Sequence, residues 1–283
     1  MLFAAGGVGA GCGGGGGDGG VDAGPFLDAG PGDFQIDRVG QVSLIEGGGY
    51  LSTYALIQDR PELPVPVIVA QGAECTVFRR PPPALCQPAC TDGVCTAPDT
   101  CTPWGRNASA GTITVTGLRA PLAFVPGTYG YVPTPAPGEE LFDAGATVAV
   151  SAPGDVTPGF AVELTAPPPL AAPFQNLTLR DGVDATITWS PAPGGGAGAR
   201  SIQVALVVGW HGAPPEALLV CETADDGELV IPGALITALP RASSGLEPHL
   251  SWIQRFDRAV VAAPAGPIEI VVGSQVTLYV THP

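Results

Sequence analysis

Glycine and proline recur along the whole chain and divide it into short β-prone runs. The sequence contains 41 Gly and 32 Pro, and both residues interrupt helices. One of the runs between them is Thr112–Thr116, in which Ile113 and Val115 alternate with threonine, as in a strand with one buried face. Many short strands separated by turn residues predict an all-β fold built from β-sandwiches.

The length of 283 residues is enough for two domains. Pro167–Pro169 and the following Ala171–Pro173 predict a stiff linker. We therefore expect two tandem β-sandwiches, one over 34–166 and one over 167–283. The expected strands are Val39–Glu46, Leu51–Gln58, Pro66–Gln71, Glu74–Arg79, Gly111–Gly117, Leu122–Val125, Ala146–Ser151, Phe160–Glu163, Ser201–Trp210, Ala217–Thr223, Glu228–Ile231, His249–Phe256, Ala259–Ala262 and Ile268–Val280. One short helix is expected over Pro232–Leu239, with Pro240 closing it.

Five of the seven cysteines crowd into residues 75–101. This loop has little apolar content and needs covalent cross-links to hold a structure. We therefore expect disulfides in an oxidising compartment, formed by Cys75, Cys86, Cys90, Cys95 and Cys101. The favoured pairing is Cys86–Cys95 with Cys90–Cys101, and Cys75 pairs either within the cluster or with Cys221. Zinc is the alternative, although the C-x2-C spacing of many zinc sites is missing.

The first residues have the form of the end of a bacterial lipoprotein signal peptide. Residues 1–11 are small and apolar, and they lead to Cys12, which would carry the lipid. A basic n-region is missing, so we expect the true signal to start upstream. Residues 13–33 are rich in Gly, Asp and Pro and predict a disordered spacer. The expected membrane attachment is therefore a lipid anchor, because no run of 18 uncharged apolar residues occurs.

Several motifs carry a family resemblance. Residues 72–160 resemble predicted secreted lipoproteins of GC-rich Gram-negative bacteria in a Gly-x-x-Cys strand, a Cys-x-Pro-x-Cys loop, a Gly-x-Ile-x-Val-x-Gly strand and the run LFDAGATVAVSAPGDVTPGF. The segment NLTLRDGVDATITWSP resembles the first two strands of fibronectin type III and related immunoglobulin-like domains. That second resemblance implies that Trp189 lies in a core.

The sequence predicts no catalytic centre, metal or cofactor. The three histidines, His211, His249 and His282, lie outside H-E-x-x-H spacing and are expected in surface turns, and no G-x-S-x-G motif occurs. Two acidic turns, 181–184 and 225–228, offer oxygen ligands for calcium, but Asp-Gly is also an ordinary hairpin signal. The net charge of −15 repels phosphate backbones, so we expect no nucleic-acid partner.

The expected function follows from these points. We predict a non-enzymatic structural or adhesive lipoprotein of the cell envelope, anchored in the outer membrane or extracellular, with a protein or polysaccharide partner. A carbohydrate- or ligand-binding module is the first alternative, with Trp104 as its weak candidate residue, and a hydrolase with an unrecognised site is the second. Trp189 and Trp252 lie in apolar strand patterns and are expected in cores.

Overall fold

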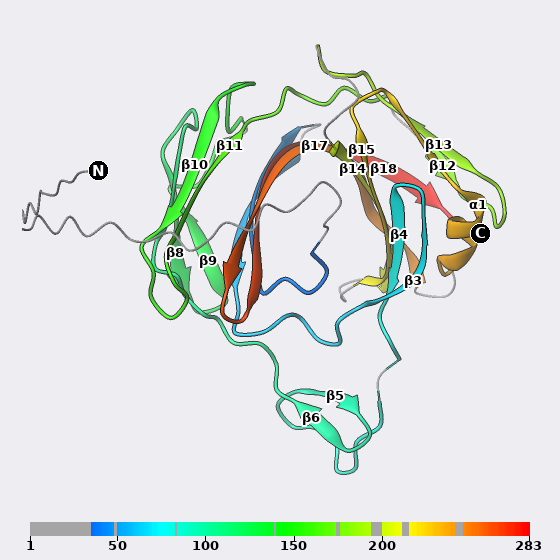
Figure 1. The fold of residues 1–283 in the computed structure, drawn as a ribbon, viewed down its shortest axis with the longest axis horizontal. Helices are drawn as coiled ribbons and strands as arrows, with labels where there is room; N and C mark the ends of the chain where they lie inside the picture. The colour runs from blue at the N-terminus through cyan, green and yellow to red at the C-terminus, as the bar shows by residue number, and fades with distance from the viewer. Residues whose placement is uncertain are drawn as a thin grey trace, which may run out of the picture.

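The computed structural model describes residues 35–47, 50–82, 84–138, 140–173, 176–193, 200–210, 215–241 and 246–283 (Figure 1). The expected lipidation site Cys12 and the spacer 13–33 lie outside these residues. Within the described residues the secondary structure is strand, apart from the short helix α1 (Gly233–Ala238). The predicted all-β class is therefore confirmed. The same residues contain no helix of the length and apolarity that crossing a membrane requires.

The largest sheet of the described residues has nine strands, and its main path runs β2-β1-β18-β17-β14-β15-β4-β3. Both β1 and the short β12 pair with β18 in parallel. The other neighbours along the path are antiparallel. The bounds are β1 (Gly40–Gly47), β2 (Tyr50–Ile57), β3 (Val67–Gly72), β4 (Cys75–Arg79), β12 (Asn176–Thr178), β14 (Arg200–Trp210), β15 (Pro215–Ala224), β17 (Leu246–Ala263) and β18 (Gly266–Thr281).

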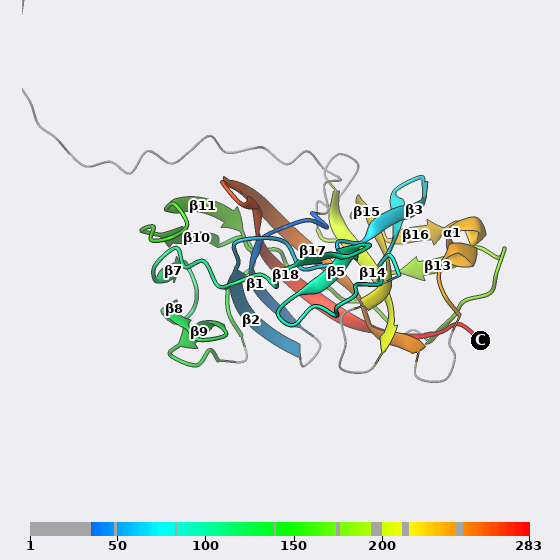
Figure 2. The same ribbon diagram turned by 90° about the horizontal axis from the view of Figure 1, so that it is seen from below.

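Two smaller layers cover this central sheet. The first is a five-stranded sheet in the order β11-β10-β7-β8-β9. The second combines the strand pair β13-β16 with helix α1, which contacts β3 and β4. The bounds are β7 (Ile113–Thr116), β8 (Leu122–Gly127), β9 (Gly130–Thr134), β10 (Thr147–Ala152), β11 (Phe160–Thr165), β13 (Ala185–Thr188) and β16 (Glu228–Ile231). Figure 2 shows the two layers at opposite ends of the long hairpin β17–β18.

Each layer encloses its own hydrophobic core against the central sheet. One core joins Val42, Phe124, Val150 and Ile270 to their neighbours, and the other joins Val77, Ile187, Leu219, Ile236 and Ile253 to theirs. Both cores lie on the same face of the central sheet: along β18, Ile270 and Val272 enter the first core and Leu278 the second, and residues at even spacing in a strand share a face. The sheet is bent so that both layers lie on its outside (Figure 1), and its inner face carries two cavities.

The structure does not separate into the two expected domains, 34–166 and 167–283. Strand β1 pairs with β18, and β4 pairs with β15, so both halves of the sequence build one sheet. The expected linker is also packed into the molecule: Leu170 is buried, and the carbonyl oxygens of Pro168 and Pro169 accept hydrogen bonds from Arg255 at 3.2 and 2.9 Å. The two sandwich cores exist, but they are interleaved along the chain.

The cysteine-rich loop forms a separate projection beside the central sheet (Figure 1). It contains the hairpin of β5 (Val94–Ala97) and β6 (Thr100–Thr102). The sequence patterns did not predict this hairpin, and they also did not predict strand β9 of the five-stranded sheet. The disulfides Cys86–Cys95 and Cys90–Cys101 close the loop, in the pairing favoured from the sequence. The third disulfide links Cys75 to Cys221 across β4 and β15.

Candidate ligand-binding cleft

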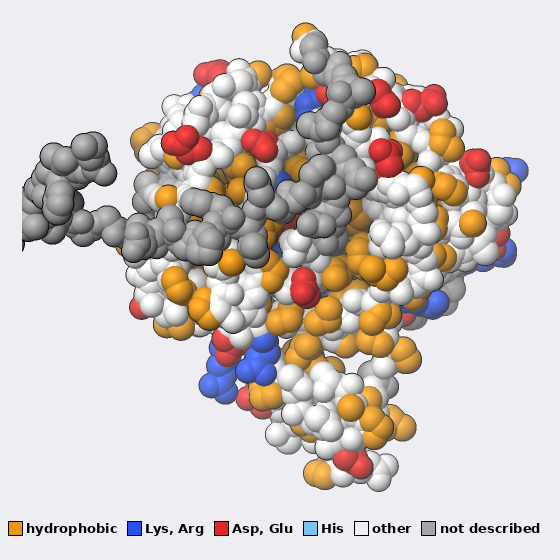
Figure 3. Space-filling model, in the orientation of Figure 1, with side chains coloured by type: hydrophobic (Ala, Val, Ile, Leu, Met, Phe, Trp, Pro, Cys, Tyr) orange, Lys and Arg blue, Asp and Glu red, His pale blue; other side chains and the backbone are white. Residues whose placement is uncertain are grey.

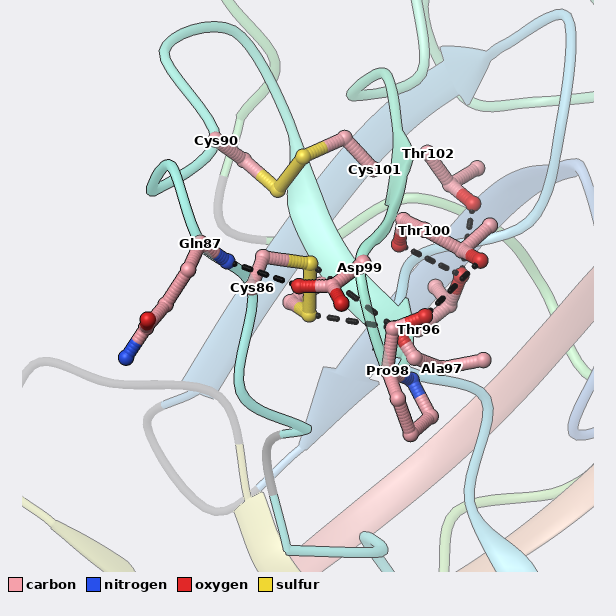
Figure 4. The surroundings of a disulfide bond; sticks show 11 residues. Cys86, Gln87, Cys90, Thr96, Ala97, Pro98, Asp99, Thr100, Cys101 and Thr102 are labelled. Carbon is pink, nitrogen blue, oxygen red and sulfur yellow. Dashed lines mark hydrogen bonds between the residues drawn. A yellow bond between two sulfur atoms is a disulfide. The ribbon is translucent and has the colours of Figure 1, made fainter.

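The cysteine cluster has the geometry of a metal site but the wrong chemistry. The sulfurs of Cys86, Cys90 and Cys95 lie within 4.8 Å of one another. All three belong to disulfides, whereas a metal ligand must be a thiolate. Figure 4 shows how the two bonds and the contact from the Gln87 backbone N–H to the Asp99 carboxylate, at 2.9 Å, hold the loop. The projection is therefore a covalently fixed scaffold.

Trp104, the sequence candidate for ligand binding, lies just after β6. Its side chain is 50% exposed, and it does not line either cavity of the cleft described next. Apolar side chains gather on the surface of the neighbouring projection (Figure 3). Trp104 is therefore half-exposed and lies apart from both cavities of the cleft.

The hollow inner face of the central sheet holds a cleft made of two adjoining cavities, of about 450 and 360 Å³. The cavities share wall residues from β1, β2, β15 and the segment before β1, which are Arg38, Gln41, Tyr54, Pro215 and Leu218. The inner cavity extends over β14, β17 and β18, where Gln203, Gln254 and Glu269 line it. These residues alternate with core residues along each strand, so the pattern that builds the cores also builds the cleft.

A buried polar network forms part of the cleft wall. The guanidinium of Arg258 donates to both carboxylate oxygens of Glu222, each at 2.8 Å, and to Glu269 at 3.2 Å. Gln203 donates to Glu222 at 2.8 Å, and Gln254 donates to Gln203 at 3.0 Å. The network thus connects four adjacent strands of the sheet and fixes these side chains in place.

The charges of this network balance. Arg258 and Arg38 both form ion pairs with Glu269, and Arg258 also pairs with Glu222. Burial by itself would lower the pKa of Arg258, but the hydrogen bonds and charges of the two glutamates outweigh it and raise that pKa above its ordinary value. Arg38, Arg258, Glu222 and Glu269 together therefore carry two positive and two negative charges, and this network has no net charge.

Trp252 lies on this inner face, which corrects the expectation that it is a core residue. It lines the inner cavity, while its neighbour Ile253 points to the opposite face and into a core. Among the described side chains, the indole Nε1 of Trp252 is the one buried polar atom without a hydrogen-bond partner. Phe256, two pleats along the same strand, supports Arg258, whose guanidinium carbon lies 5.0 Å from the ring centre.

Trp189 has the opposite environment and confirms the core position that the family resemblance implied. It is 5% exposed within the second core, and its Nε1 donates to Asp225 at 2.7 Å. Arg255 also donates to Asp225, at 2.8 and 3.1 Å. Burial opposes the charge on Asp225, but the hydrogen bonds from Arg255, Ala192 and Trp189 lower its pKa overall. This acidic turn is therefore a structural clamp, already occupied by a cation from its own chain.

His282 is buried, with 1% exposure, which corrects its expected surface position. Its Nδ1 lies 3.2 Å from the carbonyl oxygen of Pro240, and its Nε2 lies 3.0 Å from a carboxylate oxygen of Asp181. Asp181 also pairs with Arg241, and Asp184 accepts a hydrogen bond from the backbone N–H of Gly233 at 2.7 Å. The acidic turn 181–184 therefore binds groups of its own chain, which are the ring of His282 and the backbone at the start of helix α1. His211 and the side chain of His249 lie outside the described residues.

Comparisons with known proteins place few limits on this chain. No protein-family model matches it, and no curated protein matches it. Among solved structures, the FN1–FN3 domains of chicken CNTN1 align over 77% of this chain and 64% of that chain, with 10% identity and a TM-score of 0.18. At this TM-score the likeness carries no argument about fold or function. The comparisons indicate no catalytic family, and the observations on the chain itself define an all-β, disulfide-linked protein with a cleft lined by polar and apolar side chains.

Proposed function

We propose that the protein is an exported, non-enzymatic structural or adhesive protein of the cell envelope, held on a membrane by a lipid on Cys12. The observation that supports export is the set of three disulfides. The bond between Cys75 and Cys221 lies inside a core and spans 146 residues. Disulfides of this kind form and persist in oxidising compartments outside the cytosol.

The projecting loop supports an adhesive role. It extends from the body of the protein (Figure 1) and exposes apolar side chains (Figure 3). Leu85 on this loop is 83% exposed. Two disulfides hold the loop in one shape, which reduces the entropy lost when a partner binds it.

A fractionation experiment tests this proposal. The full chain, preceded by its native upstream sequence, is expressed in its native host beside a Cys12→Ala variant. We expect the parent protein in the envelope fraction with the mass of an acyl modification, and the variant in the soluble exported fraction. Finding both proteins in the cytosol with alkylatable thiols would refute export, and equal membrane retention of both would refute the lipid anchor.

The cleft favours a second candidate function, that of a ligand-binding module. Its combined cavities have the size of small-molecule sites, and its polar side chains are fixed by mutual hydrogen bonds. A hydrolase is less well supported by the same residues. Glu222 and Glu269 both contact Nη1 of Arg258, so a guanidinium occupies the position between two carboxylates where a glycosidic bond would be cleaved.

A further inference from the structure

We infer that the cleft on the inner face of the central sheet binds a neutral oligosaccharide segment, and that the indole N–H of Trp252 donates a hydrogen bond to it. This inference rests on the second candidate function, the ligand-binding module, and names its ligand class. It is independent of the proposed lipid anchor, because every residue that carries it belongs to the central sheet or its edge.

The unpartnered indole nitrogen is the first observation. Buried donors in folded proteins nearly always have an acceptor, and Trp252 Nε1 is the exception among the described side chains. Trp252 also lines the inner cavity. An oxygen atom of a bound ligand would supply the missing acceptor, whereas an apolar ligand would leave the donor unpaired.

The chemistry of the surrounding wall is the second observation. A sugar ring offers hydroxyl groups at its edge and C–H groups on its faces, so its site needs planar polar groups beside aromatic surface. The inner cavity combines both kinds of group. Its aromatic lining residues are Trp252, Tyr54 and Phe256, and its uncharged polar ones are Gln41, Ser43, Ser52, Gln203, Gln254, Gln275 and Thr277.

The charge balance is the third observation, and it selects a neutral ligand. The cationic groups in the cleft, Arg38 and Arg258, already form ion pairs with glutamate. Arg80, which lines the outer cavity, lies 3.4 Å from Glu62, another residue of that cavity. A phosphate or an acidic peptide that bound Arg258 would have to break its buried pairs with Glu222 and Glu269, and breaking a buried pair is strongly unfavourable. The adjoining cavities have room for more than one sugar ring.

Calorimetric titration tests the inference with defined probes. The full chain, produced by export so that its disulfides form, is titrated with neutral hexasaccharides: β-1,4- and α-1,4-linked glucose, β-1,4-linked xylose and β-1,4-linked N-acetylglucosamine. Hexaglutamate and a neutral hexapeptide of serine and glycine serve as competing ligand classes. We expect at least one hexasaccharide to bind and neither peptide to do so.

Two matched variants locate the site. Trp252→Phe keeps an aromatic ring but removes the N–H donor, and we expect it to bind the hexasaccharide about tenfold more weakly, the loss that corresponds to one hydrogen bond. Trp104→Phe makes the same change at the exposed tryptophan and should bind like the parent. Gln254→Met provides a second test within the cleft and should also weaken binding.

Each outcome decides the question. Weakened binding in both cleft variants, with Trp104→Phe unchanged, supports the inference. Binding of a peptide in place of the saccharides, no saccharide binding at millimolar concentration, or loss of binding in Trp104→Phe alone would overturn it. These failures leave the fractionation result untouched, so the envelope proposal and the cleft inference stand or fall separately.

Discussion

Exchanging each of two tryptophans for phenylalanine should have very different effects on stability. Trp189 donates its indole N–H to the buried carboxylate of Asp225 at 2.7 Å, whereas the buried Nε1 of Trp252 has no partner among the described residues. Both changes remove the same atoms, and the lost apolar contact costs about 1 kcal/mol in each case. The difference between the two variants therefore reports the state of the N–H group.

The magnitudes follow from the hydrogen bonds. Removing a hydrogen bond to a charged group costs about 1.5–3 kcal/mol, and removing an unsatisfied buried donor recovers about 1–3 kcal/mol. We therefore expect Trp189→Phe to be less stable than the parent by about 2.5–4 kcal/mol. Trp252→Phe should lie within about 2 kcal/mol of the parent, on the stabilised side or unchanged.

Urea unfolding with intact disulfides measures both variants. The midpoint and slope of each curve give the free energy of unfolding, and an unchanged slope shows that the unfolded states are comparable. Equal destabilisation of the two variants would refute the reasoning, because it would mean that both indole N–H groups have equivalent partners in the ligand-free protein.

Two further predictions concern the cross-link and the pH dependence. Replacing both Cys75 and Cys221 by alanine should lower the free energy of unfolding by about 2–5 kcal/mol, measured by urea unfolding; replacing Cys86 and Cys95 should leave the cores intact, and the reverse order of effects would contradict the fold. The pKa of Asp225 is lowered from its usual value of 3.8 in the folded protein, so its contribution is present above that pH and is lost as the pH falls below it. Asp225→Asn should therefore be less stable at neutral pH and lose less stability on acidification, and an acid limb identical to that of the parent would contradict this assignment.

The sequence patterns predicted the local structure well where burial alternates along one strand. Ile113 and Val115 are both buried, as their spacing with threonine indicates, and the helix expected over Pro232–Leu239 appears as Gly233–Ala238. The favoured disulfide pairs Cys86–Cys95 and Cys90–Cys101 are also the ones present. These features depend on neighbours within a few residues, which a sequence displays directly.

The interleaved sheet could not be predicted in the same way. Strand β17 was expected as two strands, His249–Phe256 and Ala259–Ala262, with Asp257 and Arg258 between them. In the structure Arg258 stays within the strand, because Glu222 pairs with it from 36 residues away. A charged residue within an apolar strand pattern indicates a turn unless an oppositely charged residue pairs with it. Only the folded structure shows which residue forms that pair.

The cleft was missed for a related reason. Trp252 and Ile253 are neighbours in one apolar run, but they point to opposite faces of a sheet: Ile253 enters a large core, whereas Trp252 lines the inner cavity. Likewise, His282 is the penultimate residue and was expected on the surface, whereas Asp181, 101 residues away, lies against its ring. Which face is covered, and by what, is decided by long-range packing.

Peptide mapping of the unreduced protein tests the central claim most directly. That claim is that both halves of the chain build one sheet in an oxidising compartment, with β4 and β15 joined by a disulfide. Proteolysis of native-host protein under alkylating conditions, followed by mass spectrometry, should yield a peptide that contains Cys75 linked to one that contains Cys221. Free thiols at these positions, or Cys75 linked to a cysteine of the projecting loop, would contradict the account.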